Sequence, residues 1–455
     1  MAIQGGFKMT EVGMIPSDWE VFELSQLYDI TSSKRVFQKD WTSAGVPFYR
    51  AREIAVMSAG KTPEDDLFIT REMFDAYTTQ YGKIRENDVL ITGVGTLGKV
   101  YVVKAKDEFY FKDGNIIWLQ WKRKNSSLLL KLFFETNIVI DQIFGNSGGS
   151  TVATYTISNA KKTKIPLPPT IKEQQRIANA LSDVDSLIAN LEKLIDKKKN
   201  IKQGAMQQLL TGKKRLPGFG LDERTGSRPT DERRKECHSE RSAKREVEES
   251  SGYKMTELGM IPTDWEVKTL NELCECNRSS TLSLPKEFVY VDLESVCQGK
   301  LLKRQIVKAC DAPSRAQRFF EKDDILYQTV RPYQKNNLKV DFDAKNYIAS
   351  TGYAVLHSKE SLLNCDYLYQ YIHTDRFVDV VMDNCSGTSY PAINPKTLMT
   401  FEIIVPSSIE EQTAIANVLS DMDTEISALE TKLAKYRTLK TGMMQQLLTG
   451  KIRLV

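Results

Sequence analysis

The sequence predicts an α+β protein in which two related globular domains are joined by two long helices that pair as an antiparallel coiled coil. Two pairs of repeated segments carry this prediction. Residues 8–21 (KMTEVGMIPSDWEV) reappear with conservative changes as residues 254–267 (KMTELGMIPTDWEV), and residues 165–216 align with residues 403–454 without a gap. The longer pair also has apolar residues at alternating spacings of three and four, which is typical of coiled-coil helices.

The repeats divide the chain into five segments. We expect a first globular domain at 1–164, a first long helix at 165–216, a charged linker at 217–253, a second globular domain at 254–402 and a second long helix at 403–455. Between the matching ends, the interiors at about 22–164 and 268–402 differ almost completely. A duplicated frame around different interiors indicates a shared scaffold that carries separate specificities.

The linker is dense in charges of both signs and nearly free of large apolar residues. Such a segment cannot bury enough surface to fold alone, so we interpret it as a tether. A basic nucleic-acid-binding arm is the alternative, but its acidic residues roughly balance its basic ones.

The composition is that of an ordinary folded protein. The 455 residues suggest two to four domains, and 41% hydrophobic and 27% charged residues are usual for globular chains. No run of about eighteen apolar residues occurs, and the first residues lack an apolar signal core, so we expect a cytoplasmic protein without a membrane span. A net charge of +4 permits a nucleic-acid partner but does not require one.

Cysteine and histidine usage argues against a disulfide framework and against histidine-based hydrolysis. The seven cysteines all lie in the second half, their number is odd and they form no CxxC pair, which favours free thiols. For Cys274 and Cys276, two half-buried thiols are a better interpretation than a metal site, because no second pair or histidine cluster accompanies them. Only three histidines are present, and we expect no metal and no cofactor.

The two long helices have matching apolar seams. The seam residues are Ile177, Leu181, Val184, Ile188, Leu191 and Ile195 in the first helix, and Ile415, Leu419, Met422, Ile426, Leu429 and Leu433 in the second. Each helix should begin after a proline-containing turn (165–169 or 406–408) and end near Thr211-Gly212 or Thr449-Gly450. About 39 residues span roughly 58 Å. So long a helix is poorly stable alone, so we expect the seams to pack on each other; the alternative is that each helix packs on its own domain.

The domain interiors are predicted to be mixed α/β. The candidate strands are 46–49, 89–92, 100–103, 116–119, 288–291, 325–328 and 353–356, and the candidate helices are 127–140 and 362–381. Gly93–Gly98 fits a dinucleotide-binding pattern, but a strand rather than a helix follows it, so we interpret it as a hairpin turn. Residues 55–62 fit a relaxed phosphate-loop pattern, but Pro63 and an acidic run follow at once and disfavour a nucleotide.

Basic and amide side chains suited to DNA are clustered in both interiors. Lys and Arg neutralise phosphates, whereas Arg, Gln and Asn pair with base edges. For any single residue, a solvated surface position is the more frequent explanation, so only the clusters support an interface. The candidate DNA-binding residues are Lys34, Arg35, Arg50, Arg52, Lys83, Arg85 and Lys99 in the first domain and Lys303, Arg304, Arg315, Arg318, Arg331, Tyr333, Gln334, Lys335, Asn336, Ser389 and Tyr390 in the second.

Taken together, the motifs resemble the specificity subunits of type I restriction-modification enzymes. The resemblance rests on Gly-Met-Ile-Pro-(Ser/Thr)-Asp-Trp-Glu-Val in each half, on Ile-Pro-Leu-Pro-Pro near residue 165, on Gly-Thr-Ser-Tyr-Pro-Ala-Ile-Asn at 387–394 and on the two Gln-Gln-Leu-Leu-Thr-Gly helix ends. It covers nearly the whole chain except the linker. Two departures are the length and charge of that linker and the absence of Tyr-Pro-Ala at Thr151–Tyr155.

The resemblance implies two target recognition domains, each reading one half of a split double-stranded DNA site. It also implies that the helices space these domains and dock two methyltransferase subunits, that restriction subunits join the full complex, and that this chain is not itself an enzyme. We therefore expect a DNA-specificity subunit without a catalytic centre. The alternatives are a coiled-coil assembly scaffold without sequence readout and a nucleotide-using enzyme built on residues 55–62.

Overall fold

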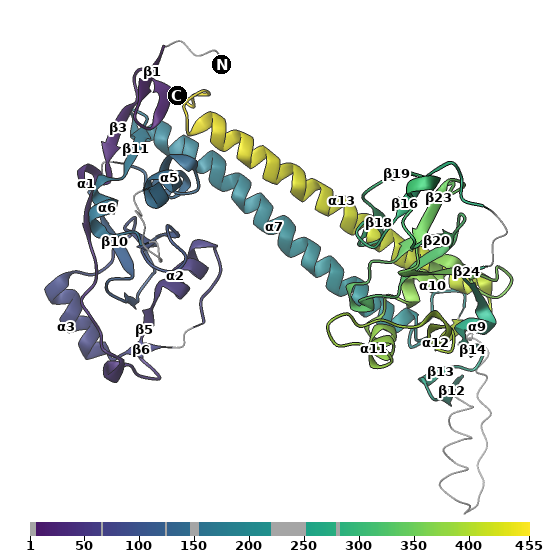
Figure 1. Cartoon of the computed structure of the whole chain (residues 1–455). Helices are drawn as coiled ribbons and strands as arrows, with labels where there is room; N and C mark the ends of the chain where they lie inside the picture. The colour runs from purple at the N-terminus through teal and green to yellow at the C-terminus, as the bar shows by residue number, and fades with distance from the viewer. Residues whose placement is uncertain (1–5, 65–66, 123–124, 146–153, 220–251, 279–282) are drawn as a thin grey trace, which may run out of the picture. The chain divides into compact units, whose positions relative to one another are not determined.

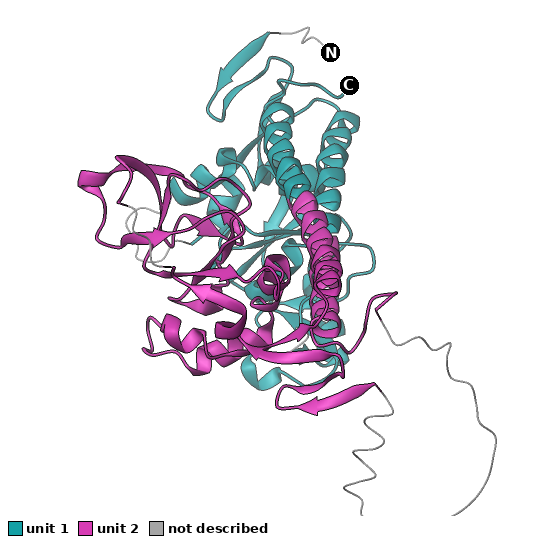
Figure 2. Ribbon diagram, turned by 90° about the vertical axis from the view of Figure 1, so that its right-hand side faces the viewer, with its two compact units in different colours: residues 1–192, 431–455 teal, residues 193–430 magenta. Residues whose placement is uncertain are grey.

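The computed structural model describes residues 6–64, 67–122, 125–145, 154–219, 252–278 and 283–455. The chain forms two compact units. Unit 1 comprises residues 1–192 and 431–455, and unit 2 comprises residues 193–430 (Figure 2). Each unit therefore contains one globular domain and a segment of both long helices.

The first domain is built around a four-stranded antiparallel sheet of order β4-β10-β7-β8. A smaller sheet, β6-β5-β9, and short helices surround it. The elements are β1 (Phe7–Thr10), β2 (Gly13–Pro16), β3 (Glu20–Glu23), α1 (Leu24–Leu27), β4 (Tyr28–Thr31), β5 (Val46–Tyr49), α2 (Ala51–Ser58), β6 (Phe68–Ile69), α3 (Arg71–Tyr81), β7 (Val89–Thr92), β8 (Val100–Val102), β9 (Tyr110–Phe111), β10 (Ile116–Trp121), α4 (Ser127–Phe133), α5 (Asn137–Gly145), α6 (Ile157–Lys162) and β11 (Lys164–Leu167).

The second domain contains a four-stranded antiparallel sheet of order β15-β24-β21-β22 and a second sheet of order β19-β16-β23-β20. Its elements are β12 (Tyr253–Thr256), β13 (Gly259–Pro262), β14 (Trp265–Thr269), α9 (Leu270–Leu273), β15 (Cys274–Cys276), β16 (Glu287–Val291), β17 (Val296–Cys297), β18 (Lys300–Leu301), β19 (Gln305–Lys308), β20 (Ala316–Phe319), β21 (Ile325–Gln328), β22 (Leu338–Lys339), β23 (Tyr347–Ser350), β24 (Tyr353–Ser358), α10 (Cys365–Tyr371), α11 (Asp375–Asp383), α12 (Pro395–Leu398) and β25 (Glu402–Pro406).

The same four-stranded sheet therefore lies inside both interiors, although their sequences differ. Matched buried aspartates directly precede the central strands β7 and β21 and tie them to a neighbouring strand of the sheet. Asp88 accepts from Trp118 Nε1 at 2.9 Å, and Asp324 lies 2.7 Å from His357 Nδ1. The residue before each aspartate, Asn87 or Asp323, has a positive φ (70° or 67°), which short polar side chains tolerate. The shared sheet is a scaffold whose connecting loops are free to differ.

The candidate strands are all present, but the two candidate helices of the interiors are not single helices. Residues 127–140 divide into α4 and α5, and residues 362–381 divide into α10 and α11. A threonine lies at the same place in each break. Thr374 caps α11 by accepting from Phe377 N, and Thr136 directly precedes α5. Threonine is a favoured capping residue. The prediction of continuous helices was wrong, because apolar spacing alone does not reveal where a cap starts a new helix.

The long helices α7 (Ile171–Leu209) and α13 (Ile409–Leu447) each contain 39 residues, as expected (Figure 1). Ion pairs fix their antiparallel direction within each unit. In unit 1, Arg437 contacts Glu192 and Lys440 contacts Asp185, whereas in unit 2 Lys198 contacts Glu425 and Lys202 contacts Asp423. In each pair the acid lies in the first half or at the middle of one helix, and the base lies in the second half of the other. Opposite charges meet only in the antiparallel arrangement.

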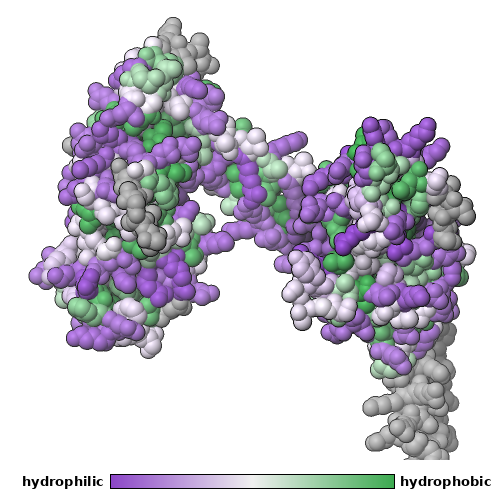
Figure 3. Space-filling view, viewed as in Figure 1, coloured by the Kyte–Doolittle hydropathy of each residue, from purple (hydrophilic) through white to green (hydrophobic). Residues whose placement is uncertain are grey.

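Most seam residues are buried; Ile188, Met422 and Leu429 are half-buried. The first turns of each helix also pack on its own domain, because Ile177 and Leu181 belong to the core around Trp19 and the corresponding Ile415 and Leu419 belong to the core around Trp265. Both arrangements considered for the helices therefore occur, at different points along each helix. Hydrophilic residues make up most of the surface visible in Figure 3.

The end of each helix completes a globular core. Leu447 and Leu448 of α13 and its following turn lie in the core of unit 1 with Trp19. Leu209 and Leu210 at the end of α7 lie in the core of unit 2 with Trp265. Both tryptophans are fully buried, so they hold the geometry and present no surface to a partner.

A glycine and an arginine after each helix lock this arrangement. Gly450 (φ 68°) lies so close to Pro16 that a β-carbon would come within 2.3 Å of Pro16 Cγ, and Gly212 (φ 69°) meets Pro262 in the same way. Arg453 then pairs with the buried Glu173 and with Asp18. The corresponding contacts in unit 2 join Arg215 to Glu411 and Asp264. The repeated sequence motifs are thus two ends of one duplicated clamp.

Candidate nucleic-acid interface

In both units, the loops that follow β7 and β21 lie at one edge of the four-stranded sheet. Gly93 N donates to Asn115 O just before β10, and Thr329 N donates to Gly352 O just before β24. A third segment joins this edge in each unit, because Tyr155 N donates to Gly93 O and Ile393 N donates to Thr329 O. Of Thr151–Tyr155, which lacks the Tyr-Pro-Ala pattern, residues 151–153 lie outside the described residues, and Tyr155 makes the same backbone contact as Ile393. Loops held on a rigid sheet edge are suited to carry a binding site.

The loop edge of unit 2 brings together several of the predicted residues. The segment 386–392 turns back on itself through paired backbone hydrogen bonds between Ser386 and Ala392, and it carries Ser389 and Tyr390. Arg331 N donates to Pro391 O at 2.7 Å, and its guanidinium lies 4.2 Å from the centre of the Tyr390 ring. Tyr390 and Tyr333 are 66% and 50% exposed. An arginine stacked on an exposed tyrosine, with a second exposed tyrosine two residues further along the loop, is chemistry suited to nucleic acid.

The neighbouring polar residues of this loop have structural partners. Gln334 Oε1 accepts from Gln328 at 2.9 Å, and Asn336 Oδ1 accepts from Gln298 N at 3.1 Å. Lys335 donates to Asp375 at 2.7 Å, and this bond lowers the pKa of the Asp375 carboxyl. These predicted residues therefore shape the loop: Gln334 and Asn336 do so through their side-chain oxygens, and Lys335 does so through its ammonium group.

The remaining basic residues of unit 2 are spread over the second sheet. Lys303 lies 3.7 Å from Glu294, and Arg304 lies over the Phe342 ring. Arg315 accepts from Thr351 N through its backbone carbonyl, which places it near the start of β24. Arg318 lies in β20, and its buried Nε has no hydrogen-bond partner among the described residues.

In unit 1, Lys34 and Arg35 lie near the last turns of α3, whereas Lys83, just after that helix, pairs with Glu108 at 2.9 Å. Lys34 Nζ lies 5.3 Å from the centre of the Tyr81 ring, and Tyr77 donates to Arg35 O. Arg35 also pairs with Asp113 at 2.9 Å, but its side chain is 65% exposed. The exposed Tyr81 was missed from the sequence; its spacing of four from Tyr77 on a helix was the available signal.

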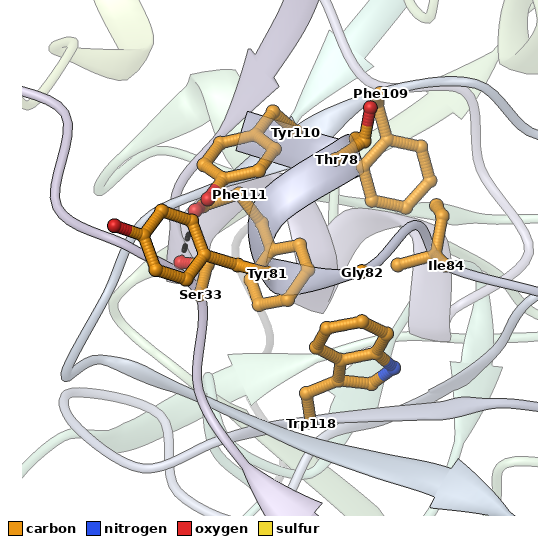
Figure 4. A pocket seen from close by; sticks show the side chains of 9 residues that line it. All are labelled: Ser33, Thr78, Tyr81, Gly82, Ile84, Phe109, Tyr110, Phe111 and Trp118. Atoms are coloured by element: carbon orange, nitrogen blue, oxygen red, sulfur yellow. Dashed lines mark hydrogen bonds between the residues drawn. The ribbon is translucent and has the colours of Figure 1, made fainter. Parts of the chain in front are cut away.

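An aromatic hollow lies beside this cluster (Figure 4). Tyr81, Tyr110, Phe111 and Trp118 surround it together with Gly82, where α3 ends. It has room for about one water molecule, which is too little for a base or a cofactor. Burial raises the pKa of the Tyr110 hydroxyl to about 12, and that hydroxyl accepts from Lys34 N at 3.0 Å. Tyr110, in the wall of the hollow, therefore supports the loop that carries Lys34.

The other predicted residues of unit 1 lie elsewhere. Arg50 and Arg52 both bind the buried carboxylate of Glu53 in α2. Burial raises the pKa of Glu53, but the hydrogen bonds from these arginines outweigh it and lower the pKa overall. Lys99 is exposed in the β7–β8 loop, whereas the exposed Arg85 lies at the other end of β7.

The two nucleotide-binding motifs of the sequence form other structures. Gly93–Gly98 is the hairpin connection between β7 and β8, closed by Gly98 N donating to Thr92 O. Residues 51–58 form α2, so a helix precedes Gly60, whereas a phosphate loop precedes its helix. Among the described residues, no three histidine, cysteine or carboxylate side chains are grouped to hold a metal.

The described cysteines are free thiols. Cys274 is buried, which raises its pKa to about 12, and Cys276 is half-buried with a raised pKa. Both therefore stay protonated and unreactive at neutral pH. In the described parts of the chain, no helix combines the length and the apolar character of a membrane span.

Comparison with known proteins matches this architecture to one family. The model of the type I restriction modification DNA specificity domain matches twice, at residues 16–203 and 262–435. The chain is 25% identical over 459 residues to a Methanocaldococcus jannaschii protein named as the MjaX specificity subunit of a type I restriction enzyme, covering 98% of this chain and 96% of that one. The MjaVIII specificity subunit of the same organism is 22% identical over 453 residues, covering 96% and 94%.

A solved structure shares the fold. The S subunit of a type I restriction-modification system from M. genitalium superposes with a TM-score of 0.56 at 15% identity, covering 98% of this chain and 99% of that one. The two family matches fall on the two repeats, and each spans one globular domain and most of its long helix. The chain therefore belongs to the family of type I restriction-modification DNA specificity subunits.

Proposed function

We propose that this DNA-specificity subunit reads a bipartite target, with one half-site bound by the loop edge of each four-stranded sheet. The observation that carries the proposal is the pairing of one shared scaffold with two different sets of loop side chains. The β7–β8 loop is small and glycine-rich, whereas the β21–β22 loop carries Arg331, Tyr333 and Lys335. Two similar sheets that carry different loop side chains favour the recognition of two different base sequences.

We further propose that the duplicated frame docks two copies of one methyltransferase subunit, with restriction subunits joining the full complex. The clamps around Arg453 and Arg215 are built from the same residue types in both units. A partner that recognises one frame would find the same surface on the other. Methyl transfer and DNA cleavage are then assigned to those partners, and this chain supplies sequence readout without a catalytic centre.

The test is the selection of targets from a random-sequence duplex library by the chain assembled with the methyltransferase subunits of its own system. The expected result is two short specified half-sites that are separated by an unspecified gap of fixed length. A single continuous site would contradict the assignment of one half-site to each domain. Binding without sequence preference would instead favour an assembly scaffold.

A domain exchange locates each half-site. Replacing only residues 268–402 by those of a relative should change one half-site and leave the other and the gap unchanged. The matched control replaces residues 22–164 and should change only the other half-site. A change in both half-sites after either exchange would contradict the division of labour.

A further inference from the structure

Two residues of the β21–β22 loop adopt a backbone conformation that side chains disfavour. Arg331 (φ 55°) and Lys335 (φ 53°) are both left-handed. The corresponding β7–β8 loop of unit 1 has its left-handed positions at Gly95 and Gly98, where no β-carbon is strained. Unit 2 thus places long side chains where glycine would be easier. Strained positions that the surrounding contacts hold in place point to a role for the side chain.

The structure explains Lys335 but leaves Arg331 without a comparable partner. Lys335 Nζ donates to Asp375 and to the carbonyl of His373, so it anchors the loop to α11. The guanidinium of Arg331 instead stacks on Tyr390, and its buried Nε has no hydrogen-bond partner among the described residues. Stacking on a ring occupies one face of the planar group and does not use its in-plane N–H donors.

The backbone around Arg331 also fixes its direction. Arg331 N donates to Pro391 O, and an isolated bridge joins Val330 to Ala392. The segment that carries Tyr390 is therefore hydrogen-bonded to the segment that carries Arg331. A phosphate contact needs only positive charge, whereas a base edge demands a donor pair of fixed orientation.

We infer that Arg331, oriented by Tyr390, reads one guanine in the half-site of the second domain. The inference rests on the proposed function. The two in-plane donors of a guanidinium match the O6 and N7 acceptors of guanine in the major groove, the most frequent specific pairing of arginine with a base. Tyr390 is a positioning residue that acts through Arg331.

The test compares Arg331→Gly, Arg331→Lys and Tyr390→Ala with the parent chain, each assembled with its methyltransferase subunits. Glycine suits the left-handed backbone, so it removes the side chain without straining the loop. Lysine keeps the charge but lacks the planar fork. The matched control is Lys345→Ala, which removes an exposed charge from the same unit. Selected targets are sequenced, and affinities for matched and single-substitution duplexes are measured at several salt concentrations.

Arg331→Gly and Arg331→Lys should each abolish the preference for G·C at one position of one half-site, by about 10-fold to 100-fold, and leave all other positions unchanged. Tyr390→Ala should weaken the same position, and Tyr390→Phe should restore it. Equal weakening at all positions with a smaller salt dependence would make Arg331 a phosphate contact and overturn the inference, as would unchanged preference. If the targets selected by the parent chain contain no specified half-sites, the proposed function itself is refuted. Thermal melting of each variant separates these outcomes from unfolding.

Discussion

Arg453 faces Glu173, 280 positions earlier in the sequence, through two hydrogen bonds, with Nε 2.5 Å from Oε1 and Nη2 2.8 Å from Oε2. The Glu173 side chain is 1% exposed, and its hydrogen bond with Arg453 raises the pKa of the arginine. Arg215 and Glu411 repeat this pair in unit 2, where Trp265 Nε1 also donates to Glu411. Each clamp therefore contains a buried carboxylate that is shielded from water and paired with an arginine.

Removing the arginine should leave that carboxylate buried without its partner. We expect Arg453→Ala to lower the free energy of unfolding by about 3 kcal/mol, measured by urea unfolding of the full chain. The control is Arg437→Ala, which breaks an exposed pair with Glu192 and should lower it by no more than about 1 kcal/mol. Equal losses in the two variants would show that the clamp is no stronger than a surface ion pair.

Gly450→Ala should destabilise unit 1 by at least about 1 kcal/mol, because φ is 68° there and the new β-carbon would lie 2.3 Å from Pro16 Cγ. Gly442→Ala is a matched control from the same helix. It lies inside α13 with nothing within 4 Å of its β-carbon position, so alanine should stabilise the helix by about 1 kcal/mol. Melting temperatures that move in the same direction for both variants would contradict the close seating of Gly450.

Ile195→Ala tests the seam of α7 in unit 2. Ile195 is 5% exposed, and truncating a buried isoleucine costs about 2 to 4 kcal/mol of unfolding free energy. Its neighbour Leu194 is 38% exposed, so Leu194→Ala should cost less than about 1 kcal/mol. Similar values for these adjacent residues would show that the seam is not packed in solution.

His373 predicts a dependence of stability on pH. Burial lowers its pKa below the usual 6.5, although its Nδ1 donates to Tyr369 O at 2.6 Å. Below pH 6.5 the unfolded chain therefore binds a proton that the folded chain refuses, and stability falls as the pH falls, by up to about 1.4 kcal/mol per pH unit. His373→Gln should reduce this slope between pH 6.5 and 5.5 in urea unfolding. Identical slopes in the parent and the variant would rule out the buried neutral imidazole.

The repeats and seams were sufficient to predict two related domains and the two long helices, because repetition and apolar periodicity can be read directly from the sequence. The ends of α7 and α13 follow the proline turns and precede Gly212 and Gly450, as predicted. The clamp could not be predicted, since it joins Arg453 to Glu173 through contacts remote in sequence. The sheet shared by the two interiors could not be predicted either. Many different β-branched and aromatic residues can occupy the same strand positions, so the two interiors have the same strand order without similar sequences.

The sequence named candidate interface residues by their type but could not show which partners they have in the fold. Arg331 and Tyr390 do meet, but Arg50 and Arg52 are held by Glu53, and Lys83 pairs with Glu108. Charge and residue type cannot reveal which cations already have a buried acid as partner. Left-handed backbone at Arg331 is equally invisible in sequence, because nothing near it marks the strain.

The seating of Leu447 and Leu448 against Trp19 has a consequence for synthesis on the ribosome. The first domain lacks part of its core until the whole second domain has been translated. At about 5–20 residues per second, the interval between Leu167 and Leu447 is roughly 15 to 60 seconds. During that time the apolar surface around Trp19 that Leu447 and Leu448 will cover stays exposed to solvent. We therefore expect chaperones to bind the nascent chain. A chain that terminates before Leu447 would leave the core of the first domain incomplete.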